Sequence, residues 1–150
     1  MNIRDVAVER LLIHKPPILM IDRAVSHATD GVTCEVEIRP DNIFCTDAGV
    51  PAFVAVEFMA QAIGVFDGWH RIQHNGVPRI GYLVGTRQLD LYCDYFSPGQ
   101  VLTIGANLVW DGVHLVQFRC YTADKMRNEE LARATINVYS PDRDSSEGLL

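Results

Sequence analysis

The longest apolar run of the chain covers residues 50–66, where 13 of 17 residues are apolar. The four exceptions are Pro51, Glu57, Gln61 and Gly64. A helix of this length spans about 25 Å, which is less than the roughly 30 Å of a bilayer core, and a carboxylate at a bilayer centre is costly. The pattern therefore predicts a helix buried on nearly all sides inside a protein, not a membrane span.

Strand patterns lie on both sides of this helix. Before it, apolar and polar residues alternate at residues 32–39, as in a half-buried strand. After it, several segments are rich in residues that favour strands. We expect strands at 101–109, 113–123 and 131–139, turns at 110–112 and 128–130, and one bent strand or two within 80–95, ended by a turn at 96–99.

The two ends of the chain carry weaker signals. The first 25 residues predict a short amphipathic piece, a break at Pro16 and Pro17, and an apolar run at 18–21 that enters the sheet. The polar residues 140–150 predict a frayed C-terminal tail. The order of elements predicts one α+β domain over residues 1–139, with an antiparallel sheet packed around one long helix.

Composition narrows the class of protein. A length of 150 residues suits one domain, and 13 basic against 19 acidic residues give a net charge of −6, which argues against nucleic-acid binding. No secretory core is visible in the first ten residues. The four cysteines form no C-x-x-C pair, so we expect no metal or redox site: Cys34, Cys45, Cys93 and Cys120. Unpaired cysteines that pack as apolar side chains are typical of a reducing compartment, so we expect a cytoplasmic protein.

Polar positions of the predicted helix suggest chemistry, because Glu57, Gln61 and Gly64 share one face. Glu57 is either a local hydrogen-bonding group at the helix start or a functional acid whose pKa burial raises. Such an acid can protonate a leaving hydroxyl or take a proton from carbon beside a carbonyl. Backbone N–H groups of Gly49 and Val50 are placed to hold that carbonyl, and we expect the Gln61 amide to bind substrate with them.

Three segments resemble motifs of the FabZ-type 3-hydroxyacyl-acyl-carrier-protein dehydratases. Residues 11–23, LLIHKPPILMIDR, resemble the opening L-x-P-H-R-x-P-x-L-L-x-D-R motif of that family. Residues 57–61, EFMAQ, are similar to its helix motif E-x-M-A-Q, and residues 95–102, YFSPGQVL, to its F-x-x-P-G-D-x-L turn. The resemblance implies the hot-dog fold, in which a curved antiparallel sheet wraps one long helix, and a dimer with acyl tunnels at its interface.

The reaction implied by this resemblance removes water from a 3-hydroxyacyl thioester on acyl carrier protein and gives a trans-2-enoyl thioester, in fatty-acid or aryl-polyene-type synthesis. It needs no cofactor, and Glu57 matches the family's catalytic helix glutamate. The family's H-F-P-G loop is replaced here by the shorter NIFCTDAGVP of residues 42–51, which has no histidine. This loop is more similar to the ApeP-type branch, which is associated with aryl-polyene synthesis.

The second catalytic group is therefore open between His14, in the opening motif, and Asp47, in the shortened loop. Each also has a structural interpretation, His14 as a hydrogen-bonding group of its loop and Asp47 as a turn former. Residues 69–89 contain no acidic residue. Their arginines, Arg71, Arg79 and Arg87, are either ordinary solvated charges or a docking surface for an acidic carrier protein and its phosphopantetheine-linked acyl chain.

Three functions stay open on these residues. The first is a dehydratase, as a homodimer or as a heterodimer with another hot-dog subunit. The second is a hot-dog acyl thioesterase, because a carboxylate on the central helix can also activate water. The third is a non-catalytic partner subunit of a dehydratase heterodimer, because the usual loop histidine is absent.

Overall fold

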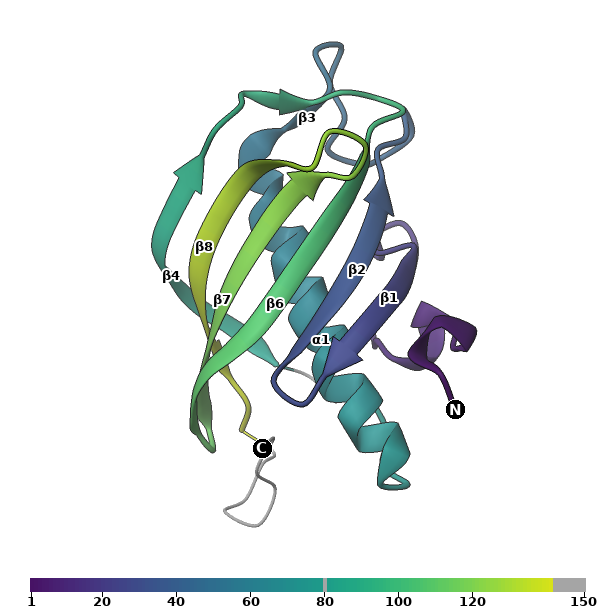
Figure 1. Cartoon of the computed structure of the whole chain (residues 1–150), viewed down its shortest axis with the longest axis vertical. Coiled ribbons are helices and arrows are strands. Elements are labelled where there is room, and N and C mark those ends of the chain that lie inside the picture. Colours follow the sequence, from purple (N-terminus) through teal and green to yellow (C-terminus); the bar gives the residue numbers. More distant parts are fainter. Residues whose placement is uncertain (80, 142–150) are drawn as a thin grey trace.

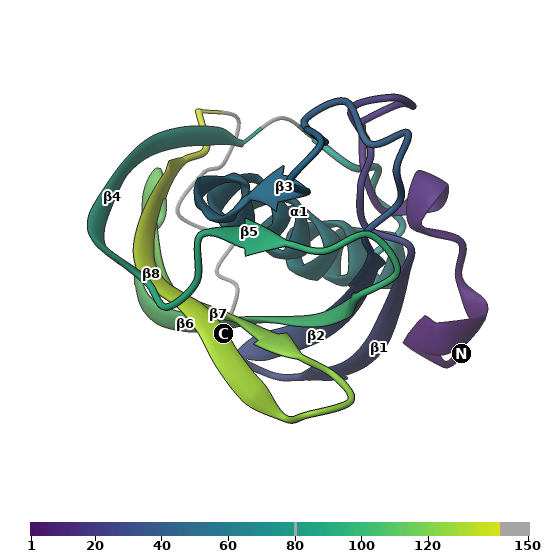
Figure 2. The same cartoon turned by 90° about the horizontal axis from the view of Figure 1, so that it is seen from above.

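The fold is one helix enclosed by a curved antiparallel sheet, in a computed structural model that describes residues 1–79 and 81–141 (Figures 1 and 2). This arrangement confirms the predicted α+β class. The helical elements are η1 (Ile3–Asp5), η2 (Val8–Arg10), η3 (Ala52–Val54) and α1 (Ala55–Gln73). The strands are β1 (Arg23–Ala28), β2 (Gly31–Glu37), β3 (Val50–Pro51), β4 (Tyr82–Leu91), β5 (Tyr95–Phe96), β6 (Val101–Gly112), β7 (Leu115–Asp124) and β8 (Glu129–Tyr139).

The main sheet has the strand order β1-β2-β6-β7-β8-β4, and all its pairs are antiparallel. Alternate residues of β6 face the helix and are buried, as are their counterparts on β7 and β8. A small second sheet pairs β3 with β5 beside the start of α1 (Figure 2). The start of the helix is thereby fixed at one end of the curved sheet.

Helix α1 is the centre of the core, and its residues Phe58, Met59, Ala62 and Val65 are fully buried. It begins and ends later than predicted, because the start of the apolar run forms β3 and η3, while the more polar end continues to Gln73. By length and composition, residues 52–73 can cross a membrane, but 67% of the most apolar window is buried within the fold. Most of the apolar run therefore belongs to a helix that is packed inside the fold.

Two glycines of α1 let the N-terminal segment pack directly against the helix. A Cβ at Gly68 would collide with the backbone carbonyl of Leu11, and one at Gly64 would lie 2.6 Å from Cδ2 of Leu12. The Leu11 backbone cannot move aside, so Gly68 requires the absence of a side chain, whereas a Cβ at Gly64 would only displace the end of the Leu12 side chain. The segment that carries His14 is thereby held close to the same helix face as Glu57.

Some predicted elements were wrong in detail. Residues 18–21 stay outside the sheet and contact α1, while the first strand is β1, at Arg23–Ala28. The β6–β7 turn lies at residues 113–114, with Val113 at a φ of 72°, although the Asp-Gly pair before it predicts a turn at 110–112. Residues 125–128 form the β7–β8 turn, earlier than predicted, with Asn128 at a φ of 51°.

The cysteines follow their expected character only in part. All four are free thiols; Cys34 and Cys120 are buried, and burial raises the pKa of each to about 12. Cys45 and Cys93 are half-buried. At the C-terminus, Ser140 is buried and its N–H donates to the carbonyl of His114 at 2.7 Å, whereas the rest of the predicted tail beyond residue 141 lies outside the described residues.

Candidate active site

Glu57 and Gln61 form the polar centre of α1. Glu57 lies in the first turn of the helix, where the positive end of the helix dipole favours a carboxylate. Its Oε1 accepts a hydrogen bond of 2.9 Å from Nε2 of Gln61. This contact confirms that the two residues, spaced four apart, share one helix face, and it fixes the direction of the carboxylate, which is only partly buried.

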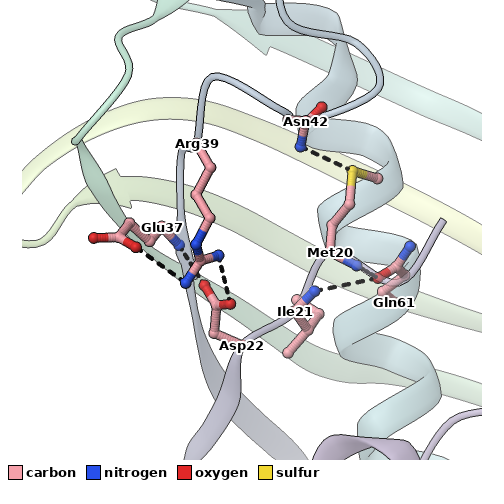
Figure 3. A network of polar contacts seen from close by, with 7 residues as sticks. All are labelled: Met20, Ile21, Asp22, Glu37, Arg39, Asn42 and Gln61. Atoms are coloured by element: carbon pink, nitrogen blue, oxygen red, sulfur yellow. Dashed lines mark hydrogen bonds and ion pairs between the residues drawn. The ribbon is translucent and has the colours of Figure 1, made fainter. Parts of the chain in front are cut away.

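Gln61 also binds the chain segment that precedes β1, as Figure 3 shows for its amide oxygen. That oxygen accepts from the N–H of Met20 at 2.9 Å and of Ile21 at 3.4 Å, and the amide nitrogen donates to the carbonyl of Ile18 at 2.8 Å. The Gln61 side chain is fully buried, and these hydrogen bonds connect it to the Glu57 carboxylate and to the segment before β1.

A carboxylate anchors the same segment on its other side (Figure 3). Asp22 accepts from the backbone N–H of Glu37 at 2.6 Å and from Nη1 of Arg39 at 2.8 Å. The hydrogen bond to Asp22 raises the pKa of the Arg39 guanidinium, because it stabilises the charged form. The opening motif of the chain therefore joins α1 to the end of β2.

A cavity of about 250 Å³ lies beside α1, one turn beyond Glu57. The helix contributes Ala60, Ile63, Gly64 and Asp67 to its wall, and the other walls come from residues 11–14, β4, β7 and β8. Most of the lining is aliphatic or aromatic, which suits an apolar ligand.

His14 lies on the wall of this cavity, together with Ala60 and Gly64. Its Nδ1 is buried and has no hydrogen-bond partner among the described residues. A buried ring nitrogen without a partner is unusual in a residue that only holds its loop. The structure thus brings His14 to the same face of α1 as the Glu57–Gln61 pair.

The loop before the helix is organised as a tight turn. Gly49 has a φ of +114°, which favours glycine, and its N–H donates to the carbonyl of Thr46 at 3.0 Å. Val50 is fully buried and pairs with Phe96 in the β3–β5 sheet. The Gly49 N–H is therefore engaged within the loop, while Asp47 is exposed in the turn.

The three arginines of the expected docking surface occupy different environments. Arg87 is exposed on β4, and Nε of the partly buried Arg71 donates to the carbonyl of Val77 at 2.7 Å. The Arg79 side chain is only 8% exposed and pairs with Asp67 at 3.2 Å on the cavity wall. Tertiary packing therefore places Arg79 in the cavity wall and not on the exposed surface that carries Arg87.

Asp67 is the polar residue of the cavity that sequence analysis missed. It lies three residues after Gly64 and ten after Glu57, so the spacing that aligned Glu57, Gln61 and Gly64 also extends to Asp67. Its helix position was therefore readable from the sequence. The pairing with Arg79 was not, because it depends on the path of the chain between α1 and β4.

The curved antiparallel sheet around one long helix is the hot-dog fold, and structures of that fold superpose on this chain. The *E. coli* PaaI protein of the phenylacetic acid degradation operon has 9% identity and a TM-score of 0.59, covering 78% of this chain and 81% of its own. A hypothetical thioesterase of *Streptococcus pneumoniae* TIGR4, solved with coenzyme A, has 12% identity and a TM-score of 0.61, covering 82% and 88%. These likenesses show the fold.

The chain belongs to the ApeP-like dehydratase family, whose model, described as ApeP dehydratase, matches residues 6–149. A chain of the dehydratase heterocomplex ApeI:P from Xenorhabdus doucetiae is similar over nearly the whole length, with 28% identity, a TM-score of 0.85, and coverage of 95% of this chain and 94% of that one. No curated protein sequence matches the chain. The family confirms the branch that the shortened loop and the EFMAQ helix motif indicated.

Proposed function

We propose that this chain acts in the dehydration of 3-hydroxyacyl thioesters, carried by acyl carrier protein, to trans-2-enoyl thioesters in cytoplasmic fatty-acid or aryl-polyene-type synthesis. The observation that supports this most is the Glu57 carboxylate, which accepts a 2.9 Å hydrogen bond from Gln61 on the same helix whose next turns line an apolar cavity. Membership of a dehydratase family agrees with this chemistry.

In the proposed reaction, a base removes a proton from C2 of the acyl chain, the C2–C3 double bond forms, and the C3–O bond breaks. Glu57 gives its proton to the leaving hydroxyl, which departs as water. The proton taken by the base returns to Glu57 through solvent before the next cycle. The base is His14, on the cavity wall, or Asp47, in the preceding loop.

The thioester carbonyl gains negative charge as the C2 proton leaves, and backbone N–H groups stabilise that charge. The N–H of Ala52 donates to the carbonyl of Asp94 at 2.9 Å and is therefore engaged. The N–H of Phe53, which follows it, also lies in the first turn of η3, where N–H groups have no partner within the helix. We propose that the Phe53 N–H, in place of that of Gly49, holds the thioester carbonyl.

The test replaces Glu57→Gln and follows enoyl thioester formation from 3-hydroxyacyl carrier thioesters. We expect a loss of about 10²–10⁴ in turnover, the usual contribution of a general acid. Glu9→Gln, at an exposed position of η2, is the matched control and keeps full activity. Unchanged turnover in Glu57→Gln would exclude this mechanism, and release of free thiol in place of enoyl product would indicate the thioesterase.

Two further variants separate the candidate bases. If His14 is the base, His14→Asn abolishes turnover while Asp47→Asn leaves it intact, and the reverse result assigns the role to Asp47. Asn has the shape of Asp and, in place of His, keeps a short hydrogen-bonding side chain, so both changes remove the titrating group. If both variants keep full turnover, neither His14 nor Asp47 is the base.

A second subunit is favoured by the exposed concave face of β4. Leu83, Leu89 and Leu91 pair with β8 residues that face the core, yet they are 48%, 38% and 40% exposed. β4 is an edge strand of the curved sheet and pairs only with β8 among the described strands, as Figure 2 shows. A second hot-dog subunit that extends the sheet at β4 would bury these side chains.

This subunit is either a second copy or a different hot-dog chain, as in the ApeI:P heterocomplex. Light scattering of the purified chain and turnover assays with and without an intact dehydratase subunit separate the two. Turnover that appears only in the mixture supports the heterodimer and the partner-subunit function, whereas full turnover of a homodimer excludes that function.

We propose that the acidic carrier protein docks near Arg71 and Arg87. Reversing the charge of Arg87 should then weaken binding of the carrier.

A further inference from the structure

The cavity beside α1 is apolar along most of its length but polar at the end away from Glu57. At that end Asp67 and Arg79 form an ion pair whose side chains are 20% and 8% exposed, and Ser140 lies on the same wall. Leu83 and Val138, on the neighbouring strands, are aliphatic. Charged groups at such a position are costly to bury, and polar groups in an apolar pocket orient the ligand.

The Asp67 carboxylate has capacity for a further hydrogen bond. Its contact with Arg79 uses one oxygen, Oδ1, whereas an ionised carboxylate offers about four acceptor sites on two oxygens. A ligand group that donates a hydrogen bond therefore fits this end of the cavity better than a methyl group. A hydrocarbon end would leave polar atoms of the pair facing an apolar surface.

The helix sets the length of chain that reaches this pair. Asp67 follows Glu57 by ten residues, or about 15 Å at 1.5 Å per residue. An extended chain advances roughly 1.15 Å per bond, taking the 3.3–3.6 Å that three backbone bonds span. About thirteen bonds therefore separate the reacting carbon from a group at Asp67.

We propose that the Asp67–Arg79 pair makes this cavity selective for long acyl chains whose far end carries a hydrogen-bond donor, such as a hydroxyl, which binds the Asp67 carboxylate. The proposal rests on the proposed function, because it takes the reacting end of the chain to lie at Glu57. It adds a specificity-determining pair at the opposite end of the site.

The test measures binding, not turnover, so a failure of the dehydration chemistry does not affect it. The probes are saturated acyl-pantetheine thioesters that lack the 3-hydroxyl and end in a hydroxyl or a methyl group. One pair of probes spans about thirteen bonds and a control pair about seven. The full chain is compared with the double variant Asp67→Leu, Arg79→Met, because replacing a buried ion pair by apolar residues of similar size often preserves the fold.

We expect the wild-type chain to bind the long hydroxyl probe about tenfold more tightly than the long methyl probe, as for one hydrogen bond to a charged group. The short pair should show no preference, and the double variant should lose or reverse the preference of the long pair while still unfolding cooperatively. Equal binding of the long probes, a preference unchanged in the variant, or binding of neither probe because a second subunit fills the cavity would overturn the proposal.

Discussion

Replacing Gln61→Met removes the hydrogen bonds that connect α1 to the segment before β1 and keeps a side chain of similar length. The variant leaves the Met20 N–H and the Ile18 carbonyl without the partners they have at 2.9 and 2.8 Å. It also releases the Glu57 carboxylate from its 2.9 Å contact. The substitution therefore tests whether one buried amide holds both the segment and the proposed catalytic acid Glu57.

The expected loss of stability follows from the groups left behind. A buried backbone donor or acceptor without a partner costs about 1–3 kcal/mol, so two such groups cost roughly 2–6 kcal/mol. Local rearrangement of the segment and the easier burial of Met reduce this, and we expect a net loss of about 3 kcal/mol. For a chain of this size each kcal/mol lowers Tm by about 2–4 °C, which gives a fall of roughly 6–12 °C.

Urea unfolding and hydrogen–deuterium exchange measure the two parts of this effect. The midpoint of urea unfolding should fall, while the dependence of the unfolding free energy on urea concentration stays unchanged. In hydrogen exchange, the amide of Met20 should lose more protection than the amides of β6 and β7. Gln61→Glu is the matched control, because it keeps the acceptor oxygen for Met20. It also places a second carboxylate beside Glu57, and the two carboxylates repel each other when both are ionised. The Gln61→Glu variant should therefore be more stable at pH 5 than at pH 8. A change below about 1 kcal/mol in Gln61→Met would refute this reasoning.

Three other predictions follow from the packing and the titrating groups. Gly68→Ala should destabilise the fold by about 1–3 kcal/mol in thermal unfolding, because the added Cβ meets a backbone carbonyl of the N-terminal segment. Hydrogen bonding from Gln100 lowers the pKa of Asp124 in the folded chain. The Asp124 carboxylate therefore stabilises the fold above its unfolded pKa of about 3.9, and this stabilisation is lost as the pH falls through its lower folded pKa. In Asp124→Asn, the free energy of unfolding should fall less steeply with decreasing pH in the acid range than it does in the wild type. Thiol titration of the native chain should leave Cys34 and Cys120 unreactive, since burial raises the pKa of both to about 12, and reaction of all four thiols at once would contradict this.

The sequence predicted the core helix and the main strands because their apolar periodicity is strong. It misplaced the first strand because β1 is a largely exposed edge strand and lacks that periodicity, while the apolar residues 18–21 pack on α1. It misplaced the β6–β7 turn because Val113, a β-branched residue, adopts a φ of 72° that propensity rules disfavour. Both errors are cases where tertiary packing overrides a local preference.

The residues of the candidate site also differ in whether the sequence alone could place them. The Glu57–Gln61 contact depends only on a spacing of four along one helix, so it was readable from the sequence and the structure confirms it. The engaged N–H of Gly49 and the buried position of Arg79 depend on how a loop turns and on where β4 follows α1. Information of that kind is not contained in residue spacing.

The uncovered edge of β4 bears on how the chain is handled in a cell. Within the residues that the structure describes, β4 pairs with a neighbour on one side only, and it carries exposed leucines along its concave face. An unpaired, apolar strand edge is a template for aggregation. A chain made without a partner that covers β4 would be prone to aggregate, so the yield of the soluble chain should rise when the proposed second subunit is made with it.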